Sequence, residues 1–319
     1  MSSKILRYAG YAEEAVFGTP VAAEIHTDIT GATLDVPDDP NLYYVGGLGR
    51  SRRIVRPGFY SPGGNIVQGV DVDSIAYFLL WALGDYFYDA AKHHIYGATD
   101  TLLPSFTARI GKDELEHVFA GCMINTLELA VDDSFAQVTL DVIAQKDAKA
   151  ALQDVDALEL SEEALLAFHE LTLTNGLETA RVKSFTLSIE NNGDAATGRG
   201  VGSRFPYRMK AGERVVTASI NLDFDDDAQL QRFWGGATGP ADCGATEFAL
   251  ELKMQECGES TKGITIKMPR CIVSANPHQP TGRDEIDESI TVQAMLGTVG
   301  AVSTEVLFEV ANNVDPFET

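Results

Sequence analysis

A β-strand that leads through an acidic turn into an apolar helix is the clearest pattern in this chain. In residues 63–88, Asp71 and Asp73 stand where the helix begins, Ser74 or Asp73 is the expected N-cap, and Gly84 ends the helix. The apolar face of this helix is predicted to contain Ile75, Phe78, Leu79, Ala82, Leu83 and Tyr86. Its aromatic residues are typical of core packing.

The same unit recurs, in a weaker form, near Gly212. Three aspartates, Asp225, Asp226 and Asp227, open a short helix after a strand whose apolar positions are Val216, Ala218, Ile220, Leu222 and Phe224. Each half of the chain has a loop with arginines, a long strand, an acidic helix start, an aromatic helix and then three or four strands. This order predicts an internal duplication.

A strand at residues 105–110 and, after it, a hairpin are predicted in the first half. The hairpin has strands at residues 123–131 and 135–144 and a turn at Asp132, Asp133 and Ser134. One face of the hairpin contains Leu127, Leu129, Val131, Val138, Leu140 and Val142. The opposite face contains Thr126, Glu128, Thr139 and Asp141, and it is polar without positive charge. We expect His93 and His94 in a polar loop before these strands.

In the second half, a period-two strand points Phe185, Leu187 and Ile189 inward, and further strands are predicted at residues 247–254, 263–268, 271–275 and 289–296. The outward positions of this half are Ser184, Thr186, Ser188, Thr217, Ser219, Asn221 and Asp223. We predict a mainly β protein with short flanking helices. Its parts are residues 1–150 with an N-terminal arm at 8–20, a connection at 151–180 and residues 181–319 with an acidic C-terminal arm. Residues 146–165 are expected to be partly helical or irregular.

The charge excludes one class of function. Asp and Glu number 47 against 24 Lys and Arg, a formal net charge of -23. Proteins that read nucleic-acid sequence have a basic footprint, so such recognition is not expected, although an acidic wall suits DNA that only passes by. Solubility or a salty habitat explains the net charge equally well. One dense positive patch stands out, with Arg50, Arg52, Arg53 and Arg56, and it fits either a solvated loop or an interface that clamps acidic neighbours; phosphate contact is a third choice.

The sequence contains no catalytic or metal-binding signature. None of the six histidines lies in a nucleophile motif, and adjacent His93 and His94 have poor geometry for a zinc site. The residues 198–203 read as a turn, the aspartates at 223–227 as helix N-terminal acids rather than a calcium loop, and the four cysteines as free thiols. The longest strongly apolar run, residues 75–83, is shorter than the roughly 18 residues of a membrane span, and the first residues show no leader pattern. We therefore expect no cofactor, no metal and no membrane partner.

Several of these segments resemble the tail tube proteins of long-tailed bacteriophages and related archaeal viruses. The matching segments span most of the chain: YAEEAVFGTP, PGFYSPGGNIVQGVDVDSIAYFLLWALGDY, FAGCMINTLELAVDDSFAQVTLDVIAQKD, RVKSFTLSIENN and GERVVTASINLDFDD. The resemblance implies β-sandwich modules with a flanking helix, whose inner sheets join around a ring into a barrel. It also implies stacked rings that form a hollow conduit for DNA, with no enzymatic activity.

From this resemblance we expect a structural protein of the virion tail, assembled in the host cytoplasm, whose partners are itself, other tail proteins and DNA as a non-specific passenger. Two modules in one chain predict a ring of three subunits with pseudo-sixfold symmetry, and a hexamer of chains is the alternative. The polar positions expected to face the lumen are Thr126, Glu128, Thr139, Asp141, Ser184, Thr186, Ser188, Thr217, Ser219, Asn221 and Asp223. Arg50, Arg52, Arg53 and Arg56 are expected to form an inter-subunit loop. The competing interpretation is a monomeric β-sandwich that binds a carbohydrate or protein ligand; an enzyme comes third.

Overall fold

The computed structural model describes residues 8–39, 41–44, 50–89, 91–98, 102–154, 156, 158, 160–161, 163–175, 182–223, 227–242, 246–259, 261–276 and 287–312. The fold over these residues is mainly β, as predicted, with two α-helices and two short 3-10 helices: α1 (Ser74–Leu83), α2 (Ala228–Trp234), η2 (Phe168–Glu170) and η3 (Ala195–Gly198). In these ranges no helix has the length and apolar character needed to cross a membrane.

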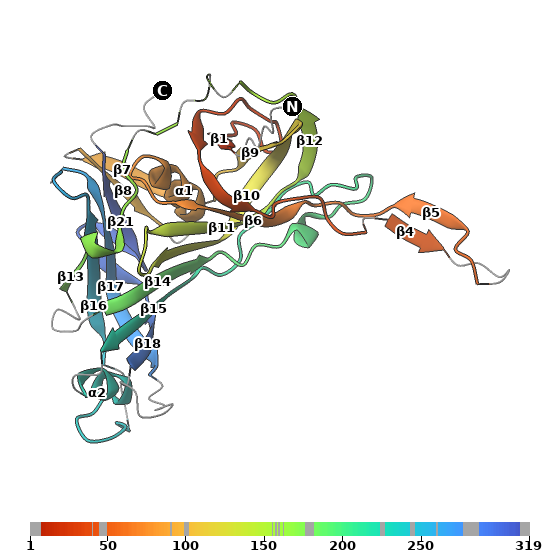
Figure 1. Ribbon diagram of the computed structural model, residues 1–319. Coiled ribbons are helices and arrows are strands. Elements are labelled where there is room, and N and C mark those ends of the chain that lie inside the picture. Colours follow the sequence, from red (N-terminus) through yellow and green to blue (C-terminus); the bar gives the residue numbers. More distant parts are fainter. Residues whose placement is uncertain are drawn as a thin grey trace.

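Eight strands form one continuous antiparallel sheet, which we call the central sheet (Figure 1). Their order is β3 (Ile29–Ala32), β6 (Gly63–Gly69), β11 (Gln137–Ile143), β10 (Leu115–Val131), β14 (Val182–Glu190), β15 (Val215–Asp223), β18 (Asp287–Ala294) and β17 (Gly263–Ala275). The pairing of β10 with β14 joins the strands of the first half to those of the second. Among the described residues, β3 and the Cys271–Ala275 part of β17 end this order, so the sheet is open.

Two outer sheets each share one long strand with the central sheet. The first has the order β2 (Ile25–Thr27), β1 (Ala9–Glu13), β9 (Phe106–Lys112), β10 and β12 (Lys146–Ala150). The second has the order β13 (Leu171–Asn175), β16 (Phe248–Gln255), β17, β21 (Leu307–Ala311), β8 (Lys92–Tyr96) and β7 (Asp85–Asp89). Two separate hairpins complete the described strands: β4 (Asn41–Tyr44) with β5 (Ile54–Pro57), and β19 (Gly297–Val299) with β20 (Val302–Thr304).

The long strand β10 crosses between sheets at a glycine. Gly121 has φ +63°, a left-handed conformation, and the register with β9 shifts between Phe119 and Cys122. A Cβ atom at this position would lie 2.8 Å from Cβ of Gln145. The buried carboxylate of Glu14 accepts the Gly121 N–H at 2.8 Å, so the backbone group freed by the irregularity is satisfied.

The pairings of the two halves correspond strand by strand. The strand order β3–β6–β11–β10–β9 of the first half is repeated in the second half as β14–β15–β18–β17–β16. Strand β1 pairs with β9 in the same way as β13 pairs with β16. Strand β12 pairs with β10 in the same way as β21 pairs with β17. The register shifts also lie at equivalent places. The extra residue Asn125 of β10 corresponds to Ser274 of β17, and Thr30 of β3 corresponds to Lys183 of β14.

Helix α1 lies inside the core, whereas α2 is peripheral. Besides the predicted face, Ala76, Leu80 and Trp81 of α1 are buried, and the Trp81 ring stacks on Phe106 with centroids 4.6 Å apart. In α2 only Gln229 is buried among the described side chains. An apolar helix without a polar face needs cover on all sides. The β7–β8 hairpin follows α1 directly and has no counterpart among the described residues after α2.

Some local predictions were wrong. The expected N-terminal arm contains β1, which is paired on both edges and buried, and the expected C-terminal arm contains β21, an interior strand; residues 313–319 lie outside the described ranges. The segment expected to be helical or irregular begins with β12. Tyr86 belongs to β7 rather than to the helix, because Gly84 ends α1 in a left-handed conformation with φ 93°.

The two histidines expected in a loop lie on β8. As neighbours on a strand they point to opposite faces. His93 is buried beside the ring of Tyr88, and His94 stacks on Phe87 with centroids 4.4 Å apart.

The N-terminus of α1 is held by Asp71 rather than by the predicted Asp73 or Ser74. The buried Asp71 carboxylate accepts the Ser74 N–H at 2.8 Å, the Ser74 hydroxyl at 2.5 Å and the Asp73 N–H at 3.0 Å. The Asp73 side chain makes no capping bond. Burial, followed by the charges of Glu163 and Asp71, raises the pKa of Asp73, so its ionised form is disfavoured in the folded protein.

Replacing Asp71 with Ala is expected to lower the free energy of unfolding by about 1–2 kcal/mol, because the helix loses its cap. Asp73→Ala is the matched control and should change it by less than about 0.5 kcal/mol, or raise it at neutral pH, where the raised pKa makes the ionised Asp73 unfavourable. Urea unfolding followed by tryptophan fluorescence measures both variants. Equal losses in the two would contradict this assignment.

Candidate functional site

The central sheet presents one polar face, and the sequence-predicted lumen residues all lie on it. In one row across the sheet, Thr139, Glu128, Ser188 and Thr217 are consecutive cross-strand partners. Asp141 with Thr126, Thr186 with Ser219, and Ser184 with Asn221 are paired in the neighbouring rows, and Asp223 follows two residues after Asn221. The residues between these positions, such as Leu127, Leu187 and Ala218, are fully buried on the other face. The pairing of β10 with β14 therefore unites both halves of the predicted set.

Several side chains on this face are already hydrogen-bonded. Asn125 donates to Oδ2 of Asp141 at 2.7 Å, and Asn221 donates to the Ser184 hydroxyl at 2.7 Å. One cation was missed by the sequence interpretation: Lys183 Nζ lies 2.7 Å from Oδ1 of Asp223. The register shift between Val182 and Ser184 makes Lys183 an extra residue, and strict alternation gave no signal for it.

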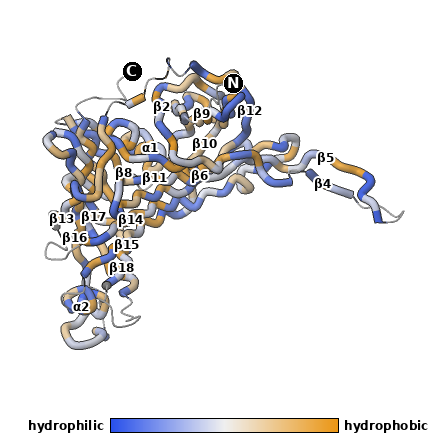
Figure 2. The backbone as a smooth tube through the Cα atoms, in the orientation of Figure 1, coloured by the Kyte–Doolittle hydropathy of each residue, from blue (hydrophilic) through white to orange (hydrophobic). Residues whose placement is uncertain are grey.

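The predicted arginine loop is an exposed hairpin, β4–β5, that projects away from the sheets (Figure 1). Every described residue of both strands is exposed, including Leu42, Tyr44 and Ile54 at 67%, 61% and 50%. The Arg52 guanidinium lies 4.5 Å from the centroid of the Tyr43 ring. Figure 2 shows the hydrophobic residues of β5 next to hydrophilic ones. Such a projection leaves apolar and cationic groups available to a partner.

The second arginine-rich loop, residues 191–214, lies against the base of this hairpin. The Tyr60 N–H donates to the Arg204 carbonyl at 2.8 Å, and the Arg204 guanidinium lies 4.9 Å from the centroid of the Tyr60 ring. Arg199 lies 4.4 Å from the centroid of Phe59 in the same way. The sequence predicts that the two loops occupy equivalent places in the two halves, and in the structure the two loops are in contact.

Tyr60 also ties the hairpin base to the first outer sheet. Its hydroxyl donates to Oδ1 of Asp147 at 2.5 Å, and Oδ2 of Asp147 lies 2.7 Å from Nε2 of His117. Burial and the hydrogen bond to Asp147 raise the pKa of Tyr60 to about 12, so the phenol remains a donor across the neutral range. These contacts hold the hairpin base in a fixed direction.

In the described part of the chain, no group of three or more His, Cys, Asp or Glu side chains is arranged to hold a metal ion. The described cysteines Cys122, Cys257 and Cys271 are free thiols, and burial raises the pKa of Cys271 to about 12. Of the aspartates at 223–227, Asp225 and Asp226 lie outside the described residues. The notable features are therefore a polar sheet face, open sheet edges and a projecting cationic hairpin.

A family model described as phage tail tube protein matches residues 6–294. The chain belongs to the phage tail tube protein family. No curated protein matches it. Membership of this family makes the protein a structural component of the virion tail. The match covers both halves of the chain, including β6, β10, β14 and β15.

In this tail tube protein, Arg204→Ala should loosen the hairpin base, because it removes the contacts with the Tyr60 and Phe205 rings. We expect amide hydrogen exchange at Tyr60 to become about tenfold faster. Arg208→Ala is the control, since that side chain is exposed on the same loop. An unchanged exchange rate at Tyr60 in Arg204→Ala would show that the hairpin is held by other contacts.

Proposed function

We propose that this protein is the major tail tube subunit, which polymerises into stacked rings around a lumen that conducts viral DNA. The observation that carries the proposal is the central sheet: in the described part of the chain it is a continuous set of eight strands with one polar face and an unpaired edge strand on each side. Unpaired edges favour pairing with another chain. A sheet that is extended by further copies and curves around an axis forms a wall with its polar face on one side.

The repeated pairing supports two tandem modules. Strand β3 occupies in the first half the place of β14 in the second, and β10 corresponds to β17. The contact of β10 with β14 within the chain is then the template for a contact between chains, in which β17 of one copy lies beside β3 of the next. Repetition of one heterologous contact closes a ring when the rotation permits it. Three chains with two modules each give the pseudo-sixfold ring.

The polar face suits a passage for DNA. Glu128 and Asp141 are acidic, the other members are mainly hydroxyl and amide groups, and the lysine beside them is paired with Asp223. Binding of DNA draws on Lys and Arg contacts with phosphates, and firm binding would slow sliding. A face of this kind gives phosphates no strong anchor. The projecting hairpin with Arg50, Arg52, Arg53 and Arg56 is placed to make contacts between subunits, where its arginines meet acidic groups.

Electron microscopy of the assembled protein tests the ring. We expect hollow tubes whose averaged cross-sections contain three chains and six similar lobes. Rings with six chains would support the hexamer instead. A monomer at all concentrations would contradict the proposed function and favour a binding module.

A lysine in the lumen should slow DNA without preventing assembly. Glu128→Lys combined with Ser219→Lys adds two cations at exposed positions of the polar face, and each phosphate contact strengthens DNA binding. We expect normal tubes and a DNA ejection rate at least about tenfold lower at low salt, recovering as salt is raised. Glu128→Gln combined with Ser219→Ala is the control. Normal ejection by the lysine variant would count against a lumenal position for this face.

A further inference from the structure

Along the direction of its strands, the central sheet has one basic end and one acidic end. The rows Asn65–Asp141–Thr126–Glu190 place the loops after β3 and after β14 at the same end. The described residues of these loops, within 33–62 and 191–214, contain nine basic and five acidic side chains, a net charge of +4. At the other end lie the turns 70–73 and 132–136 together with Asp227, and these described residues contain five acidic and no basic side chains, a net charge of -5. The subunit is therefore electrically polar along its strands.

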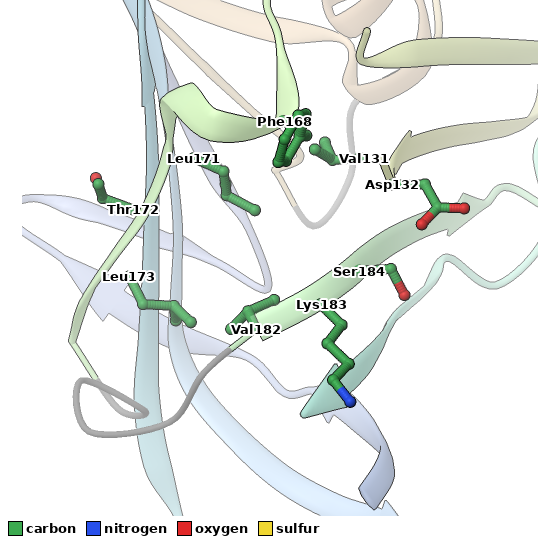
Figure 3. Close-up of a pocket in the computed structure, with 9 residues that line it drawn as sticks. All are labelled: Val131, Asp132, Phe168, Leu171, Thr172, Leu173, Val182, Lys183 and Ser184. Atoms are coloured by element: carbon green, nitrogen blue, oxygen red, sulfur yellow. The ribbon is translucent and has the colours of Figure 1, made fainter. Parts of the chain in front are cut away.

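A groove opens at the acidic end, where the two halves meet. It has a volume of about 250 Å³ and lies between the end of β10, the start of β14 and the segment of η2 and β13 (Figure 3). Its lining is mixed. The apolar side chains are Val131, Phe168, Leu171, Leu173 and Val182, and the polar ones are Asp132, Thr172, Lys183 and Ser184. Phe168 is 49% exposed. The lone basic residue of its lining, Lys183, is paired with Asp223.

The β4–β5 hairpin has the complementary chemistry. Its register places Leu42 opposite Arg56 and Tyr44 opposite Ile54, so one face combines three exposed apolar side chains with an arginine. In Figure 1 the β4–β5 hairpin lies at one side of the molecule, and β13, which lines the groove, lies at the opposite side. Because the two lie apart within one chain, a contact between them requires a second copy.

We propose that the groove at the acidic end receives the β4–β5 hairpin of a second copy in the adjacent ring. Leu42, Tyr44 and Ile54 pack on its apolar wall, and the hairpin arginines pair with Asp132 and Asp133. The inference rests on the proposed function and adds the surface that receives the hairpin. The contact is head-to-tail and does not close on itself, so it extends the stack in one direction. Each chain would therefore offer its β4–β5 hairpin to one neighbour and its groove to another.

Charge reversal tests the contact in the full-length protein. The groove variant is Asp132→Arg with Asp133→Arg, and the hairpin variant is Arg53→Asp with Arg56→Asp. Each should still form rings but raise the protein concentration needed for tubes about tenfold or more, because like charges then face each other. The combination of all four substitutions should restore tubes. Asp154→Arg with Asp156→Arg, at exposed positions, is the control for the change in net charge.

The outcomes separate the two proposals. Absence of rings and tubes in the unmodified protein contradicts the proposed function itself. If the groove and hairpin variants form tubes at the same protein concentration as the control, the hairpin–groove contact is wrong and the proposed function still stands. The same holds if the variant with all four substitutions forms rings but no tubes. If the groove variant forms no rings, Leu42→Ser with Tyr44→Ser decides, because both side chains are exposed on a separate hairpin. Unchanged tube formation by that variant also overturns the proposal; single rings support it.

Discussion

The antiparallel pairing of β10 with β14 is the contact on which the rest of the structure depends. It runs from Thr126 opposite Glu190 to Val131 opposite Phe185, and it makes one sheet of two four-stranded sets. The register places Leu127 and Leu129 beside Ile189 and Leu187 in the core, and Glu128 beside Ser188 on the polar face. A slip of one residue would exchange these faces, so burial of the leucines fixes the polar face as well.

The two helices differ in how far the core encloses them. Helix α1 is enclosed by aromatic rings, with Tyr11 and Phe78 centroids 5.0 Å apart and Trp81 stacked on Phe106. Helix α2 lies at the periphery and has a single buried residue among those described. Outside the core, the connections after β3 and β14 are held by arginine–aromatic contacts at Phe59 and Tyr60. A rigid base of this kind gives an exposed hairpin a defined direction.

Periodicity in the sequence was sufficient for the strands that have one buried face. Leu127, Leu129 and Val138 alternate with polar residues, and the predicted hairpin of β10 and β11 is confirmed. Periodicity could not reveal how far a strand continues through a glycine, as β10 does at Gly121, or that two short runs, 263–268 and 271–275, are one strand, β17. It also failed at Lys183, because an extra residue in a bulge interrupts the alternation.

The polar residues of the candidate site were predicted from alternation, and the structure adds that they share one face across both halves. The partner of each residue depends on register between strands distant in sequence, and this is why the link from Asp223 to Lys183 and the contact of Tyr60 with Arg204 were not predicted. The cap at Asp71 was missed for a related reason. Asp73 occupies the position expected for the cap, and only the geometry of the turn shows that Asp71 accepts the hydrogen bonds instead.

The junction of β10 with β14 has a consequence for how assembly begins. Its two sides belong to one chain, so they meet at an effective concentration set by the connecting segment rather than by the amount of protein in the cell. In the proposed ring of two-module chains, every second module boundary would form when the subunit folds, and only the remaining boundaries would depend on collision. Fewer independent bodies would then lose translational and rotational freedom on ring closure, which would lower the entropic barrier to starting the proposed tube.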